Sequence, residues 1–190
     1  QPMTGYQQTG YGQQPMGGFG SPVAGGVGAI LKQEPMRIAG IVGGALLLIN
    51  PFFPWLKVSY SAWGQTSSES DFLFQMGAMN VIFGLLVMIV GAAIIAWNIA
   101  EGVPALNNIK QKFGANGLME IILPAVGLVL IILLLILSFA WGKEEGEKIK
   151  DLIDIVEAFG GKASHGAGPV FGIIASICAA VPGVFKMIKK

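Results

Sequence analysis

Long apolar runs are the feature that most constrains what this chain can fold into. Residues 121–141 read IILPAVGLVLIILLLILSFAW and contain no charged side chain. A helix of about 20 apolar residues crosses the roughly 30 Å hydrocarbon core of a bilayer, whereas a helix of a soluble domain is apolar along one stripe only. Similar runs recur, and the sequence predicts membrane spans at about 38–56, 76–100, 118–141 and 169–188. The expected fold class is all-α, an integral membrane bundle of four helices.

The composition agrees with a membrane protein and limits the classes of partner. Charged residues make up 12% of the chain and the net charge is +1, whereas soluble domains carry about 25% charged residues. No dense basic patch occurs, and aromatic residues do not alternate with basic ones as they do where single strands bind. We therefore expect a multi-pass protein of the cell membrane that contacts the lipid bilayer and binds no nucleic acid.

The N-terminal segment differs in kind from the rest of the chain. Glycine, glutamine, proline and tyrosine dominate its first 28 residues, which carry no charge and no apolar period. Such a segment buries too little apolar surface to offset the entropy of ordering it. We predict a low-complexity, disordered linker over residues 1–31, followed by a four-span membrane domain over residues 32–190.

Small residues recur along the predicted spans at helix-face spacing. Glycine or another small residue at every fourth or seventh position lets a second helix approach closely. We expect helix-packing contacts at Gly40, Gly44, Gly77, Gly84, Gly91, Gly168, Gly172, Ser176 and Ala180. The polar residues near the ends of spans, Asn80, Asn98 and Glu120, are expected to reach water or lipid headgroups.

Residues 143–159 read KEEGEKIKDLIDIVEAF and indicate a helix too polar to span a membrane. Its apolar positions follow the i, i+3, i+4, i+7 spacing of one helix face, and acidic and basic residues occupy the other face. We predict an amphipathic helix along the outer membrane surface, ended by Gly160 and Gly161. The predicted inward face comprises Ile149, Leu152, Ile153, Val156 and Phe159.

The distribution of basic residues predicts the orientation in the membrane. Short cytoplasmic loops carry an excess of lysine and arginine. With both termini and the middle loop in the cytoplasm, seven basic residues lie inside: Lys32, Arg37, Lys110, Lys112, Lys186, Lys189 and Lys190. Five lie outside: Lys57, Lys143, Lys148, Lys150 and Lys162. We therefore expect both termini to be cytoplasmic.

The segment FFPWLKVSYS at residues 52–61 and the linker ahead of it carry a resemblance. Together they resemble small bacterial four-span proteins built as a zinc ribbon, a low-complexity linker and a membrane bundle. The zinc ribbon is not part of this sequence, which has no CxxC pair. The Pro-Trp segment also looks like the first extracellular strand of claudin-like tetraspans, although residues 57–75 lack the cysteine pair of those proteins.

The residues give little support for catalysis. His165 is the only histidine, in the loop ASHGAG, and Cys178 is the only cysteine, inside an apolar run. We expect no catalytic, cofactor or metal site, and a role by association as scaffold, envelope component or sensor relay. Its partners would be copies of the chain in a homo-oligomer or other membrane proteins. The alternative is a subunit of a small oligomeric channel or transporter lined by Asn80, Asn98 or Ser138, and a membrane enzyme is the third possibility.

Overall fold

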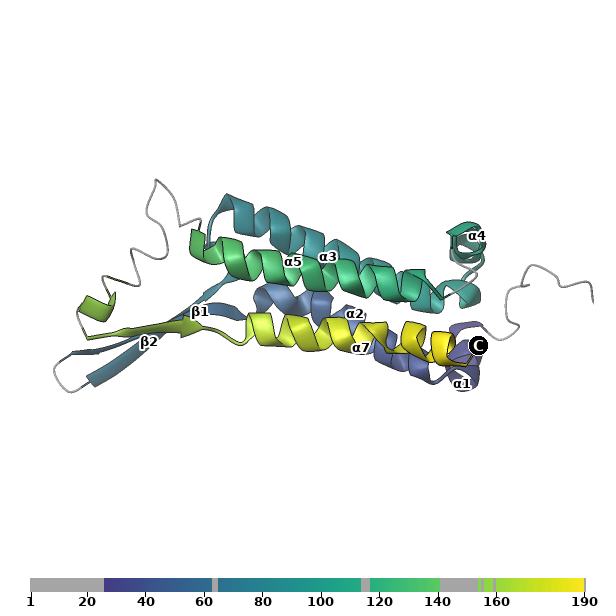
Figure 1. Ribbon diagram of the computed structural model, residues 1–190, viewed down its shortest axis with the longest axis horizontal. Coiled ribbons are helices and arrows are strands. Elements are labelled where there is room, and N and C mark those ends of the chain that lie inside the picture. Colours follow the sequence, from purple (N-terminus) through teal and green to yellow (C-terminus); the bar gives the residue numbers. More distant parts are fainter. Residues whose placement is uncertain are drawn as a thin grey trace, which may run out of the picture.

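The computed structural model describes residues 26–62, 65–113, 117–140, 154, 156–158 and 160–189. Figure 1 shows long helices running side by side, with the strands extending from one end of the bundle. Helices α1 and α4 and the C-terminus lie at the other end. We call these two ends the sheet end and the helical end.

The chain order explains why the ends differ. The described helices are α1 (Gly26–Gln33), α2 (Met36–Ile49), α3 (Ala78–Ile99), α4 (Pro104–Phe113), α5 (Met119–Ala140) and α7 (Gly168–Ile188). The strands are β1 (Pro54–Ala62), β2 (Gln65–Phe72) and β3 (Lys162–His165). Both strand-bearing segments connect helices at the sheet end, whereas α4 connects α3 to α5 at the helical end.

Three stretches of helix are long and apolar enough to cross a membrane: Ala78–Gly102, Met119–Leu137 and Gly168–Ile188. A fourth candidate is Met36–Phe52 paired with α1, which is bent away from it by 116°. These stretches correspond to the four predicted apolar runs. Helix α2 ends at Ile49, earlier than the predicted residue 56, because Pro51 has no backbone N–H to continue the helix.

The predicted linker is shorter than expected. It was assigned to residues 1–31, but α1 begins at Gly26 and buries Ile30, which is 2% exposed. An added Cβ at Gly102 would lie 2.7 Å from the Val27 backbone nitrogen and 2.9 Å from Ile30 Cδ1. Val27 and Ile30 therefore pack closely against Gly102. The composition of residues 1–31 did not predict this packing.

The all-α expectation is right for the bundle but missed a small sheet. Strand order is β2-β1-β3, and both pairings are antiparallel. Val58 of β1 lies opposite Glu69 of β2 and Ala163 of β3. Strands β1 and β2 belong to the connection between α2 and α3, whereas β3 belongs to the connection between α5 and α7. The sheet therefore joins the first and the last of the connections between the long helices.

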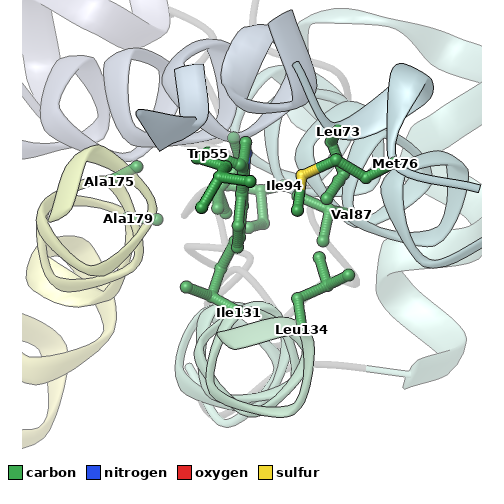
Figure 2. Close-up of a cluster of buried hydrophobic side chains, with 11 residues drawn as sticks. Trp55, Leu73, Met76, Val87, Ile94, Ile131, Leu134, Ala175 and Ala179 are labelled. Atoms are coloured by element: carbon green, nitrogen blue, oxygen red, sulfur yellow. The ribbon is translucent and has the colours of Figure 1, made fainter. Parts of the chain in front are cut away.

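A compact apolar core lies between the helices and reaches the start of β1. Figure 2 shows Ile131 and Leu134 pointing from α5 into the centre, with Ala175 and Ala179 of α7 to one side. Trp55 of β1 is 3% exposed and donates from Nε1 to the Asn50 carbonyl at 3.3 Å. Trp55 thus closes the sheet end of the core.

Candidate functional site: a ring of charges at the helical end

Six charged side chains form a closed ring at the helical end, in which acids and bases alternate. The order is Glu34, Arg37, Glu101, Lys110, Glu120, Lys186 and back to Glu34. The N–O distances in this order are 2.6, 2.8, 3.0, 3.4, 2.7 and 3.4 Å. Three positive and three negative charges therefore cancel within what we call the charge ring.

Each member of the charge ring comes from a different part of the chain. Glu34 lies in the turn between α1 and α2, Arg37 in the first turn of α2, and Glu101 just after α3. Lys110 belongs to α4, Glu120 to the first turn of α5 and Lys186 to the last turn of α7. The ring therefore joins all four long helices and α4.

Burial divides the charge ring into an inner and an outer part. Arg37 is 1% exposed, Glu120 3% and Lys110 7%, whereas the side chains of Glu34 and Glu101 are 45% and 32% exposed. An exposed ion pair contributes about 1 kcal/mol at most, but removing one partner of a buried pair costs about 3–5 kcal/mol. The fold therefore depends most on the three buried members.

Two cations of the charge ring also donate hydrogen bonds to carbonyl groups in the last turn of α3. Arg37 donates from Nη1 to the Asn98 carbonyl at 3.2 Å, and Lys110 donates from Nζ to the Trp97 carbonyl at 3.4 Å. Carbonyls of the last helical turn carry partial negative charge and attract cations. Lys110 Nζ also lies 5.7 Å from the centre of the Trp97 ring, in cation–π range.

The turn at Pro35 places Glu34 beside Arg37. A residue before proline is disfavoured in the helical conformation, and α1 accordingly ends at Gln33 and α2 begins at Met36. Partial burial alone would raise the pKa of Glu34, but the hydrogen bond and charge of Arg37, with a contribution from Lys186, hold that pKa below its ordinary value. Glu34 is therefore ionised at neutral pH.

Close helix approach at Gly183 brings the last two members together. An added Cβ at Gly183 would lie 3.0 Å from the Glu120 carbonyl oxygen and 2.6 Å from Ile121 Cγ1. Lys186 follows one turn-length later and reaches Glu120 Oε1 at 2.7 Å. Gly183 was not among the predicted packing residues, and it contributes directly to the geometry of the ring.

The structure corrects the expected positions of Asn80, Asn98 and Glu120. All three are 3% exposed and do not reach water or headgroups. The side chains of Asn80 and Asn98 donate to the carbonyls of Met76 and Ile94, four residues earlier in each case, at 2.7 and 2.9 Å. A buried amide can be satisfied by its own helix in this way, which the expectation overlooked.

Beside the charge ring the packing leaves a narrow gap with no room for a water molecule. Trp97 and Asn98 of α3 and Glu120 of α5 are among its lining residues. Trp97 Nε1, Asn98 Oδ1 and Glu120 Oε2 have no hydrogen-bond partner among the described residues. Of the three residues that were considered as the lining of a channel, Asn98 is buried beside the charge ring. Asn80 lies near the opposite end of α3. The side chain of Ser138 lies outside the described residues.

Helix α2 uses its predicted small residues, and one more, to contact two neighbours. An added Cβ at Gly40 would lie 2.6 Å from the Asn98 side chain, and one at Gly44 would lie 2.9 Å from the Gly91 carbonyl. These positions face α3. Gly43 faces α7, where an added Cβ would lie 2.5 Å from the Ala175 carbonyl. Glycines on two sides of α2 let it lie between α3 and α7.

The remaining predicted packing residues have varied surroundings. Gly84 lies against Leu73 and Phe74, Gly168 against Trp55, and Gly172 against Ile131. Ser176 is buried and its hydroxyl donates to the Gly172 carbonyl at 2.9 Å. Gly77 precedes α3 with φ 101°, a backbone conformation suited to glycine, and Ala180 lines a groove between α5 and α7.

Most of the predicted amphipathic helix lies outside the described residues, including Ile149, Leu152, Ile153 and Phe159. Val156 is described as helical and half-buried. The N–H of Gly161 bonds to the Val156 carbonyl at 2.8 Å and that of Gly160 to the Glu157 carbonyl at 3.0 Å, with Gly160 at φ 77°. This is a Schellman ending, so the described residues do end a helix at the two glycines.

The two residues considered for chemistry lie apart from the charge ring. His165 ends β3 and pairs with Leu56 at the sheet end. Cys178 is a free, half-buried thiol in α7. Within the described residues, no group of three or more His, Cys, Asp or Glu side chains is arranged to hold a metal ion.

Sequence reasoning missed the charge ring as a unit. Its members are spread from residue 34 to residue 186, and each was treated as a flank of an apolar run. One signal was available. The acids at positions 34 and 101 adjoin predicted spans, the acid at position 120 lies at the start of one, and basic residues occur near the same ends of these spans. Which acid pairs with which base depends on how the helices are arranged in space, and this signal does not give that arrangement.

No family model matches the chain, and no curated protein or solved structure matches it either.

Proposed function

We propose that this chain is a four-span membrane protein that acts by association, with the helical end in the cytoplasm and the sheet as its contact surface on the other side. The observation that carries the proposal is the exposure of strand β2. Residues 66–70 are exposed without interruption, so both faces of this strand meet solvent. Among the described strands β2 has one neighbour, β1, and its other edge is free to pair.

The chemistry of β2 suits contact with an extended segment of another chain. A strand added at a sheet edge gains backbone hydrogen bonds, and the exposed side chains provide selectivity. The sequence QTSSESDF has small polar side chains and two acids but no base. A partner strand with basic or neutral side chains would complement it.

The charge balance supports the proposed orientation. By sequence, the helical end carries seven basic and three acidic residues, whereas the sheet-end segments carry five basic and eight acidic ones. Basic residues in short loops favour the cytoplasmic side. The charge ring then ties the four spans together at the cytoplasmic surface.

The association is tested by photo-cross-linking in cells. A benzophenone amino acid at Ser67, in the exposed part of β2, should yield a discrete protein adduct. The same probe at Ile89, which is 64% exposed on α3 and faces lipid in the proposed span, is the matched control and should yield none. An adduct of twice the chain mass identifies self-association, and another mass identifies a second protein.

Absence of any adduct at Ser67 and at Ser70, in protein recovered from the membrane fraction, would contradict association through the sheet. An adduct of equal yield at Ile89 would place the contact within the membrane instead.

A further inference from the structure

An open groove lies between α5 and α7 at the helical end. Its walls run from Ile121 to Leu128 on α5 and from Ser176 to Phe185 on α7, and its volume is about 370 Å³. Apart from Ser176 the lining residues are apolar. At 1.5 Å per residue the groove is roughly 10–14 Å long, and it follows the half of each helix next to the charge ring.

Two glycines mark close approaches between α5 and α7, one on either side of the groove. An added Cβ at Gly172 would lie 2.7 Å from Ile131 Cδ1, and one at Gly183 would lie 2.6 Å from Ile121 Cγ1. Between these contacts the facing residues include the small side chains of Ala125, Ser176 and Ala180. Small residues between two points of close approach leave a channel that these helices do not fill.

The surface at the same end of the bundle carries an excess of positive charge. The three acids there, Glu34, Glu101 and Glu120, are all paired within the charge ring. The lysines outside the ring are exposed and make no ion pair among the described residues: Lys32, Lys112 and Lys189. Each such lysine near an anionic membrane surface favours binding.

Lys189 is the exposed lysine that follows the groove directly along α7. Its backbone N–H bonds to the Phe185 carbonyl at 3.2 Å, so it lies one helical turn beyond the last groove residue of α7. Phe185 is 41% exposed and Lys189 is exposed as well. A molecule with an apolar chain in the groove and an anionic group at its mouth fits both features.

We infer that the groove binds an anionic phospholipid, with one acyl chain between α5 and α7 and the phosphate next to Lys189. The inference rests on the membrane insertion proposed above, and it is independent of association through the sheet. The apolar walls provide affinity for the chain, and Lys189 provides the preference for an anionic headgroup.

The test is native mass spectrometry of the purified full chain in detergent, titrated with phosphatidylglycerol or with phosphatidylcholine of the same acyl chains. We expect phosphatidylglycerol to bind at least about fivefold more tightly, and Lys189→Gln to remove about that factor. Ala180→Phe and Ala125→Phe, which fill the groove from opposite walls, should weaken both lipids. Ala92→Phe, on the exposed side of α3, is the matched control and should weaken neither.

Equal binding of the two lipids, or no effect of either groove-filling variant, would overturn the inference. A dimer that Ala180→Phe disperses would assign the groove to a second copy of the chain and overturn it as well. Recovery of each variant in carbonate-washed membranes is measured in parallel, because loss of the unmodified chain from that fraction would contradict the proposed function instead.

Discussion

Replacing Arg37 by methionine is expected to lower the free energy of unfolding by about 3 kcal/mol, the lower end of the range for breaking a buried ion pair. Arg37 is 1% exposed and contacts Glu34, Glu101 and the Asn98 carbonyl. Methionine keeps much of the volume but removes one of the two cations that pair with each of Glu34 and Glu101, and it leaves the helix-end carbonyl without its donor. The lower end applies because Glu34 and Glu101 are partly exposed and water can solvate them.

The loss is measured by reversible unfolding in mixed micelles, followed by circular dichroism. Lys32→Met is the matched control, since Lys32 is exposed and outside the charge ring, and its effect should stay within about 0.5 kcal/mol. Adding Glu101→Gln to Arg37→Met should recover part of the loss, because the charge ring, left with one excess negative charge by the loss of Arg37, becomes neutral again. Equal stability of the Arg37 and Lys32 variants would show that the ring does not hold the bundle.

Replacing Gly43 by alanine is expected to destabilise the bundle by about 3 kcal/mol, the upper end of the cost of overpacking a core. The added Cβ would overlap the Ala179 backbone nitrogen and lie 2.5 Å from the Ala175 carbonyl oxygen. Both are backbone atoms of α7, so no side-chain rotation can relieve the overlap. The two helices must separate, which also disturbs the core around Leu47 and Ala175.

Gly28→Ala is the control, and its expected effect on stability has the opposite sign to that of Gly43→Ala. It makes the same substitution inside a helix, but nothing lies within 4 Å of the added Cβ. Alanine is favoured over glycine in a helix interior by about 1 kcal/mol, so this variant should be neutral or slightly stabilised. If both variants shift the unfolding midpoint in the same direction and by the same amount, the close approach of α2 and α7 is wrong.

The predicted limits of the last three apolar runs agree well with helices α3, α5 and α7 because their signal is local. Each run of apolar residues contains its own evidence, and α3, α5 and α7 begin and end within about two residues of the predicted limits. The glycine spacing similarly indicated that Gly40 and Gly44 face a neighbouring helix. It could not indicate which neighbour, because that depends on how the four helices are ordered in space.

The sheet and the charge ring depend on contacts between distant segments. Strand β2 has no alternating apolar pattern, and β3 has four residues, KASH, that gain their strand geometry from pairing with β1. Glu120 flanks an apolar run in the same way as an interfacial residue does. Its burial follows from Lys110 and Lys186, which reach it from two other helices.

In the proposed orientation the two ends of the bundle face opposite sides of the membrane. In a Cys178→Ala background, single cysteines at Ser67 of β2 and Asn108 of α4, both exposed, are treated in intact cells with a maleimide that cannot cross membranes. We expect labelling at position 67 in intact cells, and at position 108 only after the cells are permeabilised. Labelling at position 108 in intact cells would contradict the proposed orientation.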